Sequence, residues 1–265
     1  MKVPQSGLVI PAATDDRPGP IVIGAVGGSG TRVVADILMR AGCFMGGELN
    51  ASSDALAFVG LYDRWAAKAL HHWLRDDGPP PSAMGDDLAR ALQRHVAGIT
   101  PAHQAWGWKN PRSMLLLPWL AELLPGLRFI HVVRDGRDMA LSANQNQPAL
   151  YAPILGLEAP DDGTPALAAM RYWNRVNLMV AGYGQARLTR RYLRVRFEDL
   201  CMDSAPTVDS VLRFAQLPQS LCPACMQLVS APASIGRWHG VEPSILRQLE
   251  MAGTEALCAF GYIAG

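Results

Sequence analysis

The sequence has almost no net charge, because its 24 Lys and Arg residues are balanced by 23 Asp and Glu residues, which leaves +1 at pH 7. Nucleic-acid-binding proteins present a basic surface, so this balance gives no indication of such a partner. Long apolar runs are also missing, since no stretch approaches the roughly 18 residues of a membrane span. Neither nucleic acid nor a membrane is therefore an expected partner.

Cysteine is scarce, with five in the chain, which does not suggest the disulfide framework of a small secreted protein. Cys222 and Cys225 form a CxxC pair, but no second CxxC and no HxxxH accompanies it, as a zinc site would require. We interpret the cysteines as buried thiols. A reducing compartment, the cytoplasm, fits this composition best.

The N-terminal residues lack the pattern of a signal peptide, because their short apolar stretch is broken by Pro11 and followed by polar residues. We expect residues 1–19 to form a flexible tail. No internal repeat or low-complexity tract divides the remainder. Hydrophobic residues make up 49% of the chain, as in packed proteins, and we expect residues 20–265 to form a single domain.

Short apolar segments rich in β-branched residues alternate with segments of helical periodicity. Strands are expected at 21–25, 127–133 and 192–197, with a strand end at 106–109. Helices are expected at 31–41, 54–74, 86–96, 114–124, 137–144, 165–188, 207–216 and 243–260. Loops are expected at 145–164 and 234–240. This alternation predicts an α/β fold with three layers, α/β/α, around a central parallel sheet.

Ligands of such sheets bind at the carboxyl ends of the strands, and a glycine-rich loop follows the first strand. Glycine lets the backbone approach a ligand closely, and successive N–H groups before a helix N-terminus form an anion cradle. We assign the cradle to Gly27, Gly28, Ser29, Gly30, Thr31 and Arg32. A tight strand–helix turn without a ligand is the alternative.

The loop departs from the P-loop of ATP and GTP enzymes, GxxxxGK[ST], at two positions. Thr31 stands in place of the lysine, and Arg32 stands in place of the Ser or Thr that binds magnesium. The loop keeps the shape of a phosphate cradle but lacks the hydroxyl that would hold a metal. We therefore assign no metal site to it.

Ser29-Gly30-Thr31 after a strand is similar to the 5′-phosphosulfate loop of sulfotransferases that use 3′-phosphoadenosine 5′-phosphosulfate (PAPS). Four further segments resemble the motifs of that family in the same order: Trp108-Lys109-Asn110-Pro111, Val132 to Arg137 with Ser142, Val195 to Leu200, and Gly236-Arg237-Trp238. The resemblance covers about residues 20–240. It implies the P-loop NTPase-like sulfotransferase fold, with PAPS as sulfuryl donor and adenosine 3′,5′-bisphosphate (PAP) as product.

The resemblance assigns the 3′-phosphate of the nucleotide to Arg134, which follows a strand, and to Ser142 in the next helix. Arg237 adds a cation from the late loop. Arginine suits this role because its planar fork matches the geometry of a phosphate. The alternatives are a salt bridge of Arg134 with Asp135 or Asp138, and a helix-surface hydroxyl for Ser142.

In-line sulfuryl transfer requires a positive charge at the leaving phosphate oxygen. Many family members carry Lys or Arg immediately before Ser-Gly-Thr, whereas this chain has Gly28 there. Without a metal, another side chain must supply the charge. We expect Lys109 to do so first and Arg32 second, although a solvated surface lysine is the alternative for Lys109.

The attacking hydroxyl needs a base that accepts its proton. Glu48 follows Gly47 at a distance from the loop that resembles the base of the protein-tyrosine and related carbohydrate branches of the family. We therefore predict Glu48 as the base. His71, His72 and His103 are alternatives, because cytosolic members use a histidine.

The acceptor pocket is expected in residues 50–105 and 143–170, which hold aromatic side chains and few charges. This favours a small molecule, glycoside or carbohydrate over a polyanionic polysaccharide, and the missing anchor favours a soluble bacterial-type member. A homodimer is left open. Two other functions also stay open: a P-loop kinase-like ATP enzyme and a non-catalytic nucleotide-binding protein on the same fold.

Overall fold

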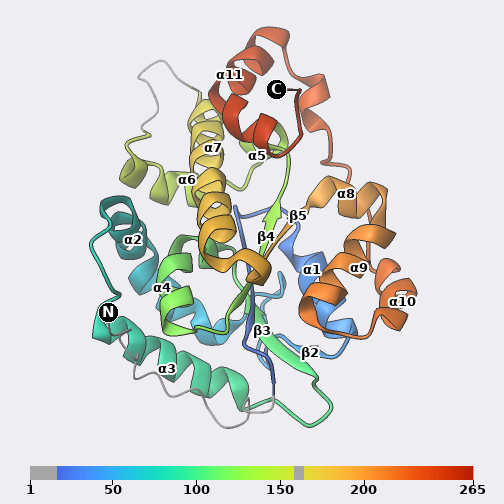
Figure 1. Cartoon of the computed structure of the whole chain (residues 1–265). Helices are drawn as coiled ribbons and strands as arrows, with labels where there is room; N and C mark the ends of the chain where they lie inside the picture. Colours follow the sequence, from blue (N-terminus) through green and yellow to red (C-terminus); the bar gives the residue numbers. More distant parts are fainter. Residues whose placement is uncertain (1–16, 158–163, 265) are drawn as a thin grey trace.

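The computed structural model describes residues 17–157 and 164–264, and its strands form one parallel sheet in the order β2-β3-β1-β4-β5 (Figure 1). The strands are β1 (Ile21–Ala25), β2 (Cys43–Phe44), β3 (Ala105–Lys109), β4 (Arg128–Val133) and β5 (Tyr192–Arg196). From β1 the chain first builds the sheet toward β2 and then crosses to β4. This reversal opens a crevice at the carboxyl end of β1, where sheets of this kind bind ligands.

Helices cover both faces of the sheet, so the three-layer α/β/α prediction is confirmed (Figure 1). One face carries α1 (Thr31–Arg40), α8 (Phe197–Met202), α9 (Ser204–Ala215) and α10 (Cys222–Met226). The other carries α2 (Val59–Arg75), α3 (Ser82–Val96), α4 (Leu117–Leu123), α5 (Gly136–Ala140), α6 (Asn146–Tyr151), α7 (Pro165–Tyr183) and α11 (Pro243–Ala259).

The strands bury both faces, which explains why β1 is an unbroken apolar run. Val22 packs into one core together with Phe129, whereas Ile21 and Ile23 pack into the other together with Ile130. Successive side chains of a strand point to opposite faces of the sheet, so covering both faces requires apolar residues at every position.

The structure differs from the sequence prediction in several elements. Strand β2 was not predicted, and it has only two residues. The helix expected from residue 54 begins instead at Val59, after a 3₁₀ turn at Leu56–Phe58. The segment expected to be a loop at 145–164 contains α6 and a 3₁₀ turn at Pro153–Leu155, while residues 158–163 lie outside the described part.

The helix expected at 137–144 ends already at Ala140, so Ser142 lies after α5 rather than on it. The late segment expected to be a loop contains a 3₁₀ turn at Arg237–Gly240. The long helix expected to reach residue 188 ends its regular part at Tyr183 and continues as a π turn over Gly184–Leu188.

The predicted tail lies largely outside the described residues, which begin at 17. Arg17 donates hydrogen bonds to the carbonyl oxygens of His103 (2.9 Å) and Thr100 (3.0 Å). The domain boundaries stay a prediction. No helix in the described part of the chain is long and apolar enough to cross a membrane.

The cysteines are free thiols, with Cys225 buried and Cys222 half-buried. The Cys225 thiol donates to the carbonyl oxygen of Ile37 (3.6 Å) and the Cys222 thiol to that of Ala205 (3.7 Å). Within residues 17–157 and 164–264, no group of three His, Cys, Asp or Glu side chains is arranged so that it could hold a metal ion.

Candidate functional site

The glycine-rich loop forms a tight turn between β1 and α1. Gly28 has φ +96° and Gly30 has φ +86°, a region that favours glycine. A Cβ atom on Gly30 would lie 2.2 Å from the ring of Phe197. The backbone N–H and the hydroxyl of Ser29 both donate to the carbonyl oxygen of Val26, at 3.2 and 2.7 Å. Only a glycine at position 30 fits against Phe197, and the Ser29 hydroxyl holds the turn together.

A cavity of about 460 Å³ opens beside this loop, a size within the range of ligand pockets. It is lined by the cradle and α1, by the ends of β3 and β4, by the segments at 52–54 and 228–234, and by Asn144 and Phe197. Of the predicted residues, those that line this cavity are Gly27, Gly28, Gly30, Thr31, Arg32, Lys109 and Arg134. Ser29 is buried beneath the loop.

Arg134 connects the cradle to the late segment. Its Nη2 donates to the carbonyl oxygen (2.5 Å) and the hydroxyl (3.0 Å) of Ser234, and it pairs with Asp138 at 3.3 Å. Its Nη1 lies 3.5 Å from the Gly28 carbonyl oxygen. The salt bridge with Asp138 considered from the sequence is therefore present. The buried Nε of Arg134 has no hydrogen-bond partner within the described residues, which leaves a donor available for an anion.

Arg237 and Ser142 lie near Arg134 but do not line the cavity. Arg237 donates to the carbonyl oxygens of Leu141 (3.2 Å) and Ser234 (3.3 Å). Arg134 and Arg237 therefore meet at Ser234, and Arg237 also holds the residue before Ser142. The Ser142 hydroxyl accepts a hydrogen bond from the backbone N–H of Asn144 (3.2 Å). The structure thus brings the three residues predicted for the 3′-phosphate into one neighbourhood.

Lys109 ends β3, and the register of the sheet pairs it with Ile23 of β1, just before the cradle. Its side chain is 2% exposed, and its ammonium pairs with the Asp54 carboxylate at 2.7 Å. Lys109 is therefore a buried lysine rather than a solvated surface one. Burial lowers the pKa of Lys109, whereas the carboxylate of Asp54 raises it.

Arg32 lies exposed in the first turn of α1, where it lines the same cavity. Its Nη1 donates to the carbonyl oxygen of Ala51 at 3.4 Å. The cavity therefore brings together three cationic side chains, those of Arg32, Lys109 and Arg134, with the carboxylates of Asp36 and Asp54. The three cations outnumber the two carboxylates, and the excess of positive charge suits an anionic ligand.

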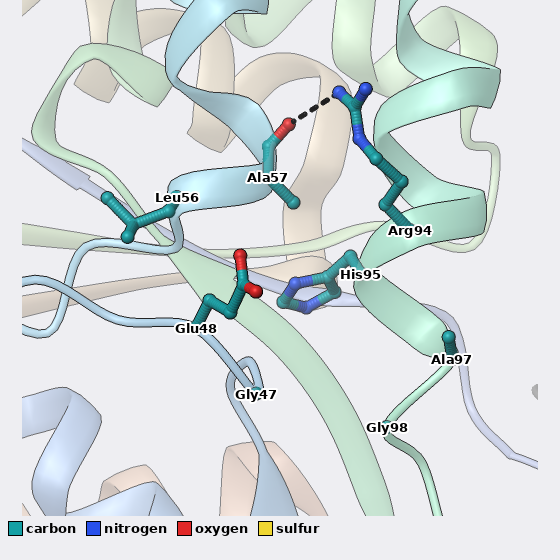
Figure 2. A pocket seen from close by; sticks show the side chains of 8 residues that line it. All are labelled: Gly47, Glu48, Leu56, Ala57, Arg94, His95, Ala97 and Gly98. Carbon is teal, nitrogen blue, oxygen red and sulfur yellow. Dashed lines mark hydrogen bonds between the residues drawn. The ribbon is translucent and has the colours of Figure 1, made fainter.

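Glu48 lines a second cavity, of about 500 Å³, and not the cavity beside the cradle. Figure 2 shows the Glu48 carboxylate and the His95 ring extending into this hollow, with Leu56, Ala57 and Arg94 around it. The Nε2 of His95 donates to the Gly107 carbonyl oxygen at 2.8 Å. Burial lowers the pKa of His95 to about 4, so its ring is neutral at pH 7.

The alternative bases lie elsewhere. His72 donates to the Gly78 carbonyl oxygen at 2.7 Å, and His103 accepts from the backbone N–H of Thr100 at 3.0 Å. His71 is exposed on α2. None of these histidines lines the cradle cavity or the Glu48 cavity.

A family model described as the sulfotransferase family matches residues 20–220. The chain belongs to the sulfotransferase family. Two solved sulfotransferases, from Mycobacterium tuberculosis H37Rv and Mycobacterium avium, are each 14% identical to it. The first has a TM-score of 0.56 over 91% of this chain and 78% of that chain, and the second has 0.55 over 94% and 78%.

A sulfotransferase domain of the olefin synthase from Synechococcus PCC 7002 is 17% identical, with a TM-score of 0.52 over 94% of this chain and 97% of that chain. At such identities these structures show a shared fold alone. A comparison with curated proteins found no match.

Within this sulfotransferase fold, Glu198 braces the sheet. Its carboxylate accepts hydrogen bonds from the backbone N–H of Asp135 (2.9 Å) and the hydroxyl of Tyr262 (2.8 Å). Sequence reasoning missed Asp54, which it assigned to the start of a helix, and Ser234, which lies in the late loop just before the motif Gly236-Arg237-Trp238.

Proposed function

We propose that this sulfotransferase-family protein transfers a sulfuryl group from PAPS to an acceptor hydroxyl. One observation carries the proposal: Arg32, Lys109 and Arg134 line a single cavity together with a glycine-rich cradle at the carboxyl ends of the strands. A nucleotide with two separate phosphate groups matches the positions of these charges, because Arg32 and Lys109 lie beside the cradle and Arg134 lies at the end of β4. The cradle suits the 5′-phosphosulfate, and Arg134 with Arg237 suits the 3′-phosphate.

The residues present fit such a donor. The backbone of Gly27, Gly28 and Gly30 lines the cavity without a Cβ atom that would stand between it and a ligand. The unpartnered Nε of Arg134 can donate to a phosphate oxygen, and charge-assisted bonds of this type are among the stronger ones in proteins. Arg237 and Ser142 would complete the set for the 3′-phosphate.

Transfer itself is an in-line displacement at sulfur. A bond forms between sulfur and the acceptor oxygen, the bond between sulfur and the 5′-phosphate oxygen breaks, and the acceptor proton passes to a base. The negative charge that develops on the leaving phosphate needs a cation. Lys109 and Arg32 supply it in this proposal, because both line the cradle cavity.

Glu48 is the proposed base, and the cavity that it lines is the proposed acceptor site. Glu48 and Asp54 belong to one segment, in which the backbone N–H of Leu56 donates to the Glu48 carbonyl oxygen (3.0 Å) and Leu49 pairs with Ala55. This segment lines both cavities, the one with Glu48 and Leu56 and the cradle cavity with Ser52 and Asp54. Besides Glu48 and the exposed Arg94, the lining consists of apolar groups and a neutral His95, which suits a moderately apolar alcohol or glycoside.

The first test measures binding of PAP by calorimetry, with and without EDTA. We expect tight binding that does not change when magnesium is removed. Hydrolysis or transfer that requires ATP and magnesium would instead favour the kinase-like alternative. The second test follows the transfer of labelled sulfate from PAPS to a panel of alcohols and glycosides. PAP binding without transfer to any acceptor would favour the non-catalytic alternative.

The base is tested in the Glu48→Gln variant. We expect loss of sulfate transfer with PAP affinity near that of the wild type, because Glu48 lies outside the cradle cavity. Glu255→Gln, an exposed carboxylate on α11, serves as the matched control and should keep full turnover. Retained transfer in Glu48→Gln would exclude Glu48 as the base.

A further inference from the structure

The segment Asn50–Asp54 is a loop that its own side chains hold in one shape. The Asn50 side-chain oxygen accepts hydrogen bonds from the backbone N–H groups of Ser52 and Asp54, both at 2.9 Å. The Asn50 amide nitrogen donates to Oδ2 of Asp54 at 3.0 Å. One oxygen of the Asp54 carboxylate is therefore fixed from within the loop.

The loop is also attached to the two elements that flank the cradle cavity. The Ser53 hydroxyl donates a hydrogen bond to the Asp36 carboxylate of α1 at 3.2 Å. The backbone of Ser53 has φ +61°. Arg32 of α1 donates to the carbonyl oxygen of Ala51. On the other side, the backbone N–H of Ala55 donates to the Lys109 carbonyl oxygen at 3.1 Å. These contacts place Asp54 between α1 and the end of β3.

The remaining oxygen of Asp54 meets the Lys109 ammonium at 2.7 Å. The Lys109 side chain is 2% exposed and that of Asp54 is 18% exposed, so the pair lies at the wall of the cavity. An ammonium group carries three N–H donors. The contact with Asp54 uses one of them, and both residues line the cavity.

We propose that Asp54 is a positioning residue, which holds the Lys109 ammonium at the cavity wall and keeps it protonated, so that Lys109 supplies the charge absent from position 28. This inference rests on the proposed function for its role in transfer. Its physical core, the dependence of the Lys109 charge on Asp54, is measurable without any acceptor.

Three charged groups act on Lys109 besides its burial. Burial lowers the pKa of Lys109 and Arg32 lowers it further, whereas Asp54 and, more weakly, Asp36 raise it. The two factors that favour the neutral amine persist when Asp54 is neutralised. The pKa of Lys109 must then fall, because a buried ammonium without its carboxylate is poorly solvated.

The direct test is an NMR titration of the chain labelled with ¹³Cε-lysine. Lys2, Lys68 and Lys109 are its lysines, and Lys109→Arg identifies the Lys109 signal by its loss. We expect Asp54→Asn to move the Lys109 titration to lower pH by about one unit or more, which is tenfold in the protonation equilibrium. Asp54→Glu keeps a carboxylate, so the Lys109 titration of this variant should return most of the way to its wild-type position. Asp63→Asn, which removes a 61% exposed partner of Arg112, is the control and should change nothing.

The functional test is the pH profile of kcat/KM for sulfate transfer. Since Lys109 must be protonated, Asp54→Asn should move the alkaline limb to lower pH, and on that limb the rate should fall roughly tenfold for each unit of the shift. In the Lys109→Arg background the same substitution should leave the limb in place, because arginine keeps its charge. A purely structural role would instead lower the rate equally at every pH.

Two results would overturn the inference: an unshifted Lys109 titration in Asp54→Asn, or a rate loss that is uniform across pH. Failure of the proposed function is a separate result, since it would appear as absent transfer by the wild type. In that case the NMR titration still decides whether Asp54 maintains the charge on Lys109.

Discussion

Gly30→Ala tests whether the cradle has the shape described, because two independent penalties meet at this position. An alanine at φ +86° costs about 1–2 kcal/mol of backbone strain. Its Cβ atom would also lie 2.2 Å from two ring atoms of Phe197, which is 5% exposed and so cannot move freely. Overpacking of this kind costs about 1–3 kcal/mol. We therefore expect a loss of about 2–5 kcal/mol in the free energy of unfolding.

Gly42→Ala is the matched control. Gly42 has a similar φ of +93°, but apart from its two chain neighbours no residue comes within 4 Å of the position that a Cβ would occupy there. It should therefore show the strain alone, about 1–2 kcal/mol. Urea unfolding of both variants gives the difference, which isolates the contact with Phe197 at about 1–3 kcal/mol. Calorimetry with PAP should show weakened binding for Gly30→Ala and unchanged binding for Gly42→Ala.

Equal destabilisation of the two variants would refute the close approach of Gly30 to Phe197. Unchanged PAP affinity in a folded Gly30→Ala protein would refute the assignment of the phosphosulfate to this loop. The two outcomes are separable, because the first concerns the packing of the loop against α8 and the second concerns its ligand.

Two further predictions concern buried charges. Burial lowers the pKa of His95 and His131 from 6.5 to about 4. As the pH falls, both rings therefore take up a proton in the unfolded chain before they do so in the folded chain. Stability should therefore fall as the pH decreases from about 6.5 to about 4, by up to about 3 kcal/mol per histidine; urea unfolding across this range, compared with His131→Asn, measures the slope. In the wild type, the Arg137 guanidinium pairs with the buried Asp135 carboxylate at 2.8 Å. Arg137→Ala removes this partner and should lower the free energy of unfolding by about 3–5 kcal/mol. An unchanged melting temperature would contradict this.

The parts of the fold that were predictable from the sequence are those whose signal is local. β1 and β4 are buried on both faces, so β1 is an unbroken apolar run and β4 is apolar except at Arg128 and His131. The cradle is recognisable through glycines that the turn requires at positions 28 and 30. β2 could not be found in this way, because two residues carry no periodicity.

The position of Asp54 shows why other parts of the site could not be predicted. Helical periodicity continues back to residue 54, but the Asn50 side chain captures the backbone N–H of Asp54, and α2 begins only at Val59. Side chains of Asn and Asp compete with helix formation in this manner. The partner of Asp54, Lys109, lies 55 residues further along the chain. No local pattern encodes that contact.

Glu48 also shows what sequence spacing leaves undetermined. Its spacing from the loop matches the family pattern, yet spacing along the chain does not state which side of a segment a side chain faces. The chain reverses between Glu48 and Leu56, and this turn places Glu48 on one cavity and Asp54 on the other. The sequence position of a candidate base is therefore weaker information than the path of the backbone around it.

The conformation of Gly28 gives a physical reason for the proposed dependence of the site on Asp54. At φ +96°, a lysine or arginine at position 28 would carry about 1–2 kcal/mol of strain, so this loop conformation disfavours the cation that many relatives have there. The same conformation presents the Gly28 carbonyl oxygen to Arg134. In the proposed mechanism, a positive charge for the leaving group must then come from another element, and Lys109 at the buried end of β3 is our candidate. Burial makes that ammonium dependent on a carboxylate, which is the chemical reason for a loop that holds Asp54 in place.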